Sequence, residues 1–229
     1  MSSNTSSHEL LPSVDVAPNT AHKSTIIWLH GLGDSGDGFA PIAPQLKLDP
    51  SLGVKFIFPH APERAVTINN GMKMRAWYDI KSADMGSRAD IEGVLESSEQ
   101  VKQLIQNEIA NGIPAHKIML IGFSQGGVIA LHLGTRFESS LAGIAALSTY
   151  MCAPNSLASE KHAANQQTPI LCCHGSQDQM VPMTQGKIAY STLQDNGYNA
   201  LFKEYPMQHS VCMEEVQDIA TFITAQLSK

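Results

Sequence analysis

The 229-residue sequence lacks the features that mark several large classes of protein. It has no apolar run near the roughly 20 residues that cross a bilayer, so we expect no transmembrane segment. Its N-terminus has neither the basic region nor the apolar stretch of a secretory signal. Its 15 Lys and Arg against 21 Asp and Glu give a net charge of -6, which argues against nucleic acid as a partner.

Cysteine is scarce as well, and the four cysteines show no CxxC spacing of the kind that binds zinc. Cys172 and Cys173 are adjacent inside an apolar run. Because we expect no secretory signal, we expect reduced thiols in a cytoplasmic protein. A cysteine nucleophile is the alternative interpretation.

No internal repeat or low-complexity linker divides the chain, and 43% of its residues are hydrophobic, which is enough for one large core. We expect residues 1–22 to form an N-terminal extension that is flexible over 1–7 and supplies an edge strand within 9–16. Residues 23–229 are expected to form a single domain.

Short apolar runs alternate with amphipathic stretches along that domain. The runs predict buried strands, and the stretches predict helices that end at glycine, as at Gly112 and Gly197. The predicted strands are 25–30, 53–59, 117–122, 141–148, 169–175 and 200–206. The predicted helices are 91–112, a helix from 126 onward, 184–197 and 212–227. This alternation indicates an α/β fold with a mostly parallel sheet that is covered by helices on both faces.

Residues 122–126, GFSQG, match the pattern G-x-S-x-G between a predicted strand and a predicted helix. In that setting the serine lies on a sharp, strained turn that exposes its hydroxyl. The helix N-terminus behind the turn favours negative charge that develops there. Ser124 is therefore the candidate nucleophile, and a serine that only caps the helix is the alternative.

A serine nucleophile of this type needs an acid and then a histidine later in the chain. Asp178 follows the predicted strand 169–175, and His209 follows the predicted strand 200–206. Both therefore fall beyond the carboxyl ends of strands, where parallel sheets place their functional loops. We predict that His209 acts as the base and that Asp178 orients it.

Other acids and histidines fit this role less well. Asp195 is nearer to the candidate base in sequence, but it lies close to the end of a predicted helix. His132 lies on the helix after the candidate nucleophile and is expected to point away from it. Three further histidines end predicted strands: His30, His60 and His174. We expect His174 to be buried and hydrogen-bonded, and His30 to shape its loop.

An acyl-transfer site also needs two backbone N–H groups that bind the developing oxyanion. One belongs to the residue after the nucleophile, Gln125. The loop 30–39, HGLGDSGDGF, follows a predicted strand, and its four glycines permit unusual backbone angles. We predict that Leu32 in this loop donates the second N–H, and an ordinary glycine-rich turn is the alternative.

Several segments together resemble the acyl-protein thioesterase and carboxylesterase family of α/β-hydrolases over residues 23–228. They are HGLGDSGDGF, FIFPHAPERAVTINNGMKMRAWYDI, GFSQGGVIAL and CCHGSQDQMVP. The resemblance implies an α/β-hydrolase fold and the hydrolysis of acyl esters, protein thioesters or lysophospholipids. It places the nucleophile at Ser124, the acid at Asp178, the base at His209 and the oxyanion donors at Leu32 and Gln125.

The resemblance further implies an acyl-binding loop at residues 63–78 that includes Ile68, Met74 and Trp77. The sequence of this loop is too irregular to predict a helix or a strand. A loop that is merely pinned to the core by its large side chains is the alternative. Arg75 is expected either to meet an anionic leaving group or to be solvated.

The sequence thus predicts a serine esterase or thioesterase that forms an acyl-enzyme and needs no metal or organic cofactor. Its substrate would be a small acyl ester, a thioester, a lipid or an acylated protein. Lysophospholipase activity, peptidase activity and a catalytically silent binding protein of the same fold are the alternatives. The sequence shows no coiled-coil pattern that would fix the oligomeric state, and a weak homodimer is one possible state.

Overall fold

A seven-stranded sheet lies at the centre of the chain, which the computed structural model describes over residues 10–85 and 88–229. The strands follow the order β1-β3-β2-β6-β7-β8-β9, and all neighbours are parallel except β1 and β3. Their bounds are β1 Ser13–Val16, β2 Ser24–Leu29, β3 Val54–Pro59, β6 Ile118–Phe123, β7 Gly143–Leu147, β8 Ile170–Gly175 and β9 Ala200–Tyr205. The mostly parallel sheet confirms the predicted α/β fold.

The N-terminal extension contributes to this sheet. Its strand β1 pairs antiparallel with β3, so that Val14 lies opposite Phe58. The edge strand expected within residues 9–16 is thus observed as Ser13–Val16. The tail expected to be flexible, residues 1–7, lies outside the described residues.

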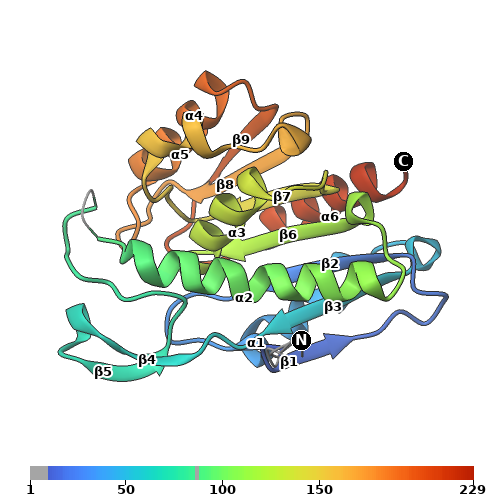
Figure 1. Cartoon of the computed structure of the whole chain (residues 1–229), viewed down its shortest axis with the longest axis horizontal. Helices are drawn as coiled ribbons and strands as arrows, with labels where there is room; N and C mark the ends of the chain where they lie inside the picture. The colour runs from blue at the N-terminus through green and yellow to red at the C-terminus, as the bar shows by residue number, and fades with distance from the viewer. Residues whose placement is uncertain (1–9, 86–87) are drawn as a thin grey trace, which may run out of the picture.

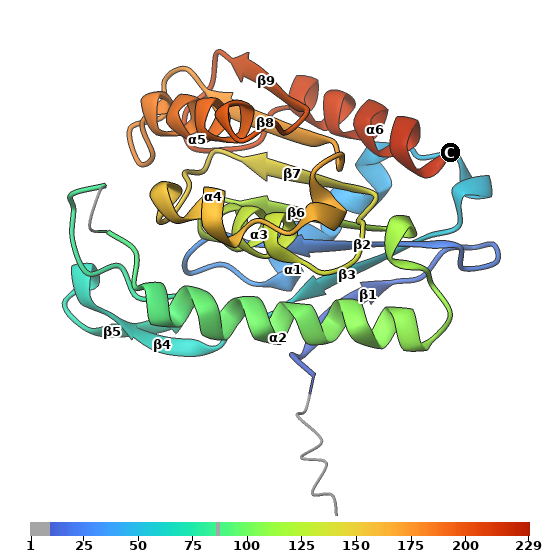
Figure 2. The same ribbon diagram turned by 45° about the horizontal axis from the view of Figure 1, so that its top comes forward.

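Helices cover both faces of the sheet (Figures 1 and 2). Their bounds are α1 Gly36–Phe39, α2 Ile91–Ala110, α3 Gln125–Arg136, α4 Leu157–Glu160, α5 Met183–Asp195 and α6 Met213–Leu227. One core holds side chains of α2, α3, α4 and α5, and the other holds those of α6 and residues 40–46. Because both faces are covered, every residue of the interior strand β2 is buried, which explains its apolar run Ile26–Leu29.

A β-hairpin projects from the end toward which the central strands point (Figure 1). Its strands β4 Glu63–Val66 and β5 Met72–Arg75 pair antiparallel. Asn70 and Gly71 turn the chain between them with φ angles of 55° and 73°. Residues 63–78, whose sequence is too irregular to predict a helix or a strand, thus contain two short strands. No helix in the described ranges is both long enough and apolar enough to cross a membrane.

Helix α6 buries a carboxyl group beneath the sheet. Glu215 is 0% exposed, and neither of its carboxyl oxygens has a hydrogen-bond partner within the described residues. Burial raises the pKa of Glu215 from 4.5 to about 8. The folded protein therefore holds this proton more tightly than the unfolded chain does. Its contribution to stability is complete below the unfolded pKa and is lost as the pH rises through the folded pKa.

We expect Glu215→Gln to stabilise the protein relative to wild type by an amount that grows as the pH rises from about 5 to about 8. The neutral amide cannot be forced to ionise inside the core. Urea unfolding at several pH values measures the effect. Glu214→Gln is the matched control, because Glu214 is exposed on the same helical turn. A difference that does not change with pH would contradict this assignment.

Candidate active site

Ser124 occupies a strained turn between β6 and α3. Its φ and ψ angles are 54° and -118°, a region that non-glycine residues enter only when the surroundings impose it. The turn is held by hydrogen bonds: the Ser124 N–H donates to Leu147 O at 2.9 Å, and the Thr149 hydroxyl donates to Ser124 O at 2.6 Å. These contacts fix the hydroxyl of Ser124 at the carboxyl end of the sheet.

The glycines around Ser124 are required by close backbone approach. A Cβ atom on Gly122 would lie 2.1 Å from Gly126 O, and one on Gly126 would lie 2.4 Å from Leu29 O. Both atoms belong to the backbone and cannot move aside as a flexible side chain would. The G-x-S-x-G pattern thus reflects how tightly strand, turn and helix pack here.

The structure brings the three predicted catalytic side chains together. His209 Nε2 lies 2.9 Å from Ser124 Oγ, and His209 Nδ1 lies 2.7 Å from Asp178 Oδ2. The His209 ring also packs against Phe123, with ring centroids 4.8 Å apart. One imidazole therefore links the hydroxyl to a carboxylate, which is the arrangement that general-base activation of a serine requires.

The carboxylate of Asp178 is held rigidly. Its side chain is 0% exposed, and Oδ1 accepts hydrogen bonds from the N–H groups of Met180 and Val181, both at 2.9 Å. His174 donates from Nε2 to Val181 O at 2.8 Å. Burial lowers the pKa of His174, so that this histidine supports the Asp178 loop as a neutral group. It is buried and hydrogen-bonded, as its sequence position indicates.

The competing residues lie elsewhere. Asp195 is exposed at the last residue of α5. His30 accepts the Ala61 N–H at 3.0 Å through Nε2, and its Nδ1 therefore donates to Gly31 O at 2.7 Å. His60 accepts the Gly36 N–H at 3.1 Å. These two histidines shape the loop after β2.

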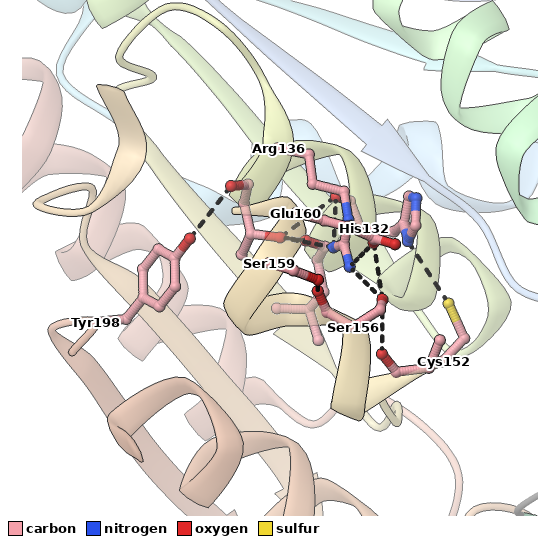
Figure 3. A network of polar contacts seen from close by, with 10 residues as sticks. His132, Arg136, Cys152, Ser156, Ser159, Glu160 and Tyr198 are labelled. Carbon is pink, nitrogen blue, oxygen red and sulfur yellow. Dashed lines mark hydrogen bonds and ion pairs between the residues drawn. The ribbon is translucent and has the colours of Figure 1, made fainter. Parts of the chain in front are cut away.

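His132 belongs to a separate polar cluster, shown in Figure 3. The Cys152 sulfur points toward its ring, with Sγ 3.8 Å from Nδ1 (Figure 3). Burial lowers the pKa of His132 to about 4 and raises the pKa of Cys152 to about 11. Both groups are therefore neutral, so the thiol is not activated as a nucleophile. Arg136 in the same cluster pairs with Glu160 at 2.7 Å and joins α3 to α4.

The loop after β2 presents Leu32 beside Ser124. Gly33 in this loop has a φ of 77° and donates its N–H to Arg75 O at 2.8 Å, which ties the loop to the hairpin. Gln125 is the first residue of α3, so its N–H has no partner within the helix. Leu32 and Gln125 both line the cavity that contains Ser124 and His209.

That cavity has a volume of about 260 Å³. Its other lining residues include Tyr78, Ile80, Arg88, Tyr150, Met180 and Val181. The hydroxyls of Tyr78 and Tyr150 are 2.9 Å apart and hydrogen-bonded to each other. Sequence reasoning missed these walls, because they come from three segments whose side chains meet only in the folded chain.

The three predicted acyl-binding residues do not line this cavity as the structure describes it. Ile68 is 41% exposed on the hairpin, and Met74 packs against the core. Trp77 is 0% exposed, and its Nε1 donates to His30 O at 2.8 Å. Its backbone N–H donates to Gln125 Oε1 at 3.0 Å. Trp77 is therefore a core residue. It connects the hairpin to the loop after β2 and to the start of α3, the two segments that carry the candidate oxyanion donors.

Arg75 likewise has a structural role, since its Nη1 donates to Ala61 O at 3.0 Å. It is partly exposed and does not line the cavity. Arg88, which the sequence did not single out, is the arginine that lines the cavity.

We expect Trp77→Ala to lower the free energy of unfolding by about 3 to 5 kcal/mol, because it leaves a large cavity in the core. It should also lower kcat/KM for esters of every acyl length alike, since the oxyanion loop loses its support. Melting curves and a series of p-nitrophenyl esters measure both effects. Ile68→Ala is the control on the same hairpin and should change stability by less than about 0.5 kcal/mol. A loss of kcat/KM confined to esters with long acyl chains would instead indicate that Trp77 binds the acyl chain.

Comparisons with known proteins support the predicted fold. The sequence profile of the phospholipase/carboxylesterase family matches residues 13–227. A Neurospora crassa protein named acyl-protein thioesterase 1 is 42% identical over 217 residues, which cover 91% of this chain and 89% of the relative. The crystal structure of Arabidopsis thaliana SOBER1 is 36% identical with a TM-score of 0.85, covering 90% of this chain and 99% of that one. The structure of Zea mays acyl-protein thioesterase 2 is 30% identical with a TM-score of 0.85, covering 94% and 99%.

Proposed function

We propose, from the premise that this chain belongs to the phospholipase/carboxylesterase family of α/β-hydrolases, that Ser124, His209 and Asp178 carry out its reaction. The chain is a serine hydrolase that acts on thioesters or esters. The observation that carries the proposal is the His209 imidazole, which lies within hydrogen-bond distance of both Ser124 Oγ and Asp178 Oδ2.

In the first step His209 Nε2 takes the proton of Ser124 as Oγ attacks the acyl carbonyl carbon. Asp178 accepts the hydrogen bond from Nδ1 and stabilises the imidazolium that forms. The tetrahedral intermediate collapses when His209 gives the proton to the leaving oxygen or sulfur. The acyl group is then bound to Ser124 as an ester.

In the second step water takes the place of the leaving group. His209 removes a proton from the water, which attacks the acyl-enzyme and releases the carboxylic acid. The proton returns to Ser124 Oγ, so the residues end as they began. Both steps use only side chains and backbone groups of this chain, together with water.

The N–H groups of Leu32 and Gln125 bind the oxyanion in both steps. The helix α3 begins at Gln125, so its positive N-terminal dipole also faces the developing charge. One such donor is typically worth about 3 kcal/mol of transition-state stabilisation. The hydrogen bonds of Trp77 to both neighbouring segments hold these donors in place.

We assign the acyl chain to the cavity rather than to the hairpin. Ile80, Tyr78, Tyr150 and Val181 give it buried walls, and Met180 lies at its exposed rim. Because relatives in Neurospora crassa and Yarrowia lipolytica are named acyl-protein thioesterases, we propose acylated proteins or acyl lipids as the substrate class.

We place the reaction in the cytoplasm, a reducing compartment in which the buried free thiols of Cys172 and Cys173 persist. A weak homodimer remains a prediction, and the proposed reaction does not require it. Every residue assigned to the reaction comes from one copy of the chain.

Partitioning between water and methanol tests the acyl-enzyme directly. An ester and a thioester that carry the same acyl group should give the same ratio of acid to methyl ester, because both pass through one intermediate on Ser124. Different ratios for the two substrates would show that no common intermediate forms, and the proposed mechanism would fail.

A further inference from the structure

One positive charge lines the cavity that holds Ser124. Arg88 lies between the hairpin and α2, and its backbone is fixed by pairing with the segment before it. The Lys81 N–H donates to Arg88 O at 3.0 Å, and Ile80 and Ala89 form a β-bridge. The arginine is therefore placed on the cavity wall by its backbone.

The guanidinium of Arg88 is poorly satisfied where it lies. Nη1 contacts Met180 O at 3.3 Å and the weakly accepting Met85 Sδ at 3.2 Å. Nε is buried without a hydrogen-bond partner, and no ion pair to Arg88 is found among the described residues. A guanidinium has five N–H donors and stays charged, so several donors remain for another group.

Arg88 shares the cavity wall with two phenols and lies close enough to act on both. Burial raises the pKa of Tyr150 to about 12, and the charge of Arg88 acts on the same phenol in the opposite direction. Burial likewise raises the pKa of Tyr78, again opposed by Arg88. Asp34, a carboxylate on the cavity wall, instead accepts the Ser35 N–H at 2.7 Å on the oxyanion loop.

We propose that Arg88 is a specificity-determining residue that binds a carboxylate or phosphate of the substrate while its acyl carbonyl lies at Ser124. A planar guanidinium suits such a group, because two of its N–H groups can bind two oxygens of the anion at once. The chain carries a net charge of -6, so a local cation is needed to offset the repulsion that an anionic substrate meets. This inference rests on the proposed function of Ser124.

Two matched substrate pairs test the proposal and separate the two places where the anion can sit. The first pair compares glutaryl with glutaramyl thioesters of N-acetylcysteamine, so that only the acyl end changes from carboxylate to amide. The second pair compares butyryl thioesters of 3-mercaptopropionate and 3-mercaptopropionamide, so that only the leaving group changes. The readout is the ratio of kcat/KM for acid over amide within each pair.

For wild type we expect this ratio to exceed one in at least one pair. In that pair Arg88→Gln should lower it by about 10-fold or more, as expected for a lost hydrogen bond to a charged group. Arg88→Lys should keep part of the ratio, because the charge remains but the planar fork is lost. The pair that responds shows whether the anion lies on the acyl side or the leaving-group side.

Lys187→Gln is the matched control for the loss of one positive charge, since Lys187 lies on α5 outside the cavity and pairs with Glu204. Its ratios should equal those of wild type. An Arg88→Gln variant that folds with both ratios unchanged would overturn the proposal. Wild-type cleavage of the neutral amides, lost in Ser124→Ala, would still support the function of Ser124 in that case.

Discussion

Ser124→Ala should lower kcat by at least ~10³-fold for both esters and thioesters, because no other hydroxyl lies within reach of His209 Nε2 in the described structure. Residual hydrolysis would come from the oxyanion donors and the cavity, which the substitution leaves in place. Alanine keeps the Cβ atom and the backbone of the strained turn, so the melting temperature should change little. Steady-state kinetics and melting curves measure both quantities.

Ser148→Ala is the matched control for this variant. Ser148 is also a buried serine with a positive φ, 45°, and its hydroxyl has no hydrogen-bond partner within the described residues. The same chemical change there should leave kcat within about threefold of wild type. If the two variants lost activity equally, a general effect of removing a buried hydroxyl from this region, and not the loss of the nucleophile, would explain the lower kcat.

Asp178→Asn should lower kcat by up to ~10⁴-fold. The N–H groups of Met180 and Val181 both point at Oδ1, so the asparagine oxygen would stay with them. Its amide nitrogen would then face His209 Nδ1 and force the proton onto Nε2. A histidine in that tautomer directs an N–H at Ser124 and cannot accept its proton. The measurement is kcat with a short ester, at a pH where wild type is fully active.

Asp195→Asn provides the comparison, because Asp195 is exposed at the end of α5 and is also an aspartate that precedes His209 in sequence. Its kcat should match wild type. A large loss in Asp195→Asn together with a small loss in Asp178→Asn would reassign the acid.

The arrangement of the strands and of the three catalytic candidates could be predicted because it depends on local patterns. Strand 169–175 is an apolar run, and the loop that follows it must lie at the carboxyl end of a parallel sheet. Asp178 and His209 were placed by that rule and by their order in the chain. The structure then shows the distances between their atoms, which no local pattern contains.

The sequence carries a local signal for the hairpin. Asn70 and Gly71 form an Asn-Gly pair, and both have positive φ angles. That dipeptide between two short segments is a strong indication of a hairpin turn. The strands themselves are hard to predict, because Glu63–Val66 and Met72–Arg75 show no clear alternation of apolar and polar side chains.

The cavity walls could not be predicted from the sequence. Tyr78, Tyr150 and Met180 come from three distant segments, and their convergence depends on how the loops pack above the sheet. Trp77 and Tyr78 are adjacent, yet only Tyr78 lines the cavity. A large apolar residue in an irregular segment suits a ligand site and a core equally well, so the sequence does not distinguish them.

Peptide mapping after reaction with a fluorophosphonate tests the central assignment most directly. The account predicts one phosphonylated site, Ser124, with activity lost in proportion to the adduct. His209→Ala should slow the labelling, because the base that activates the hydroxyl is gone. An adduct on another residue that accounts for the lost activity, or full inactivation without modification of Ser124, would contradict the assignment.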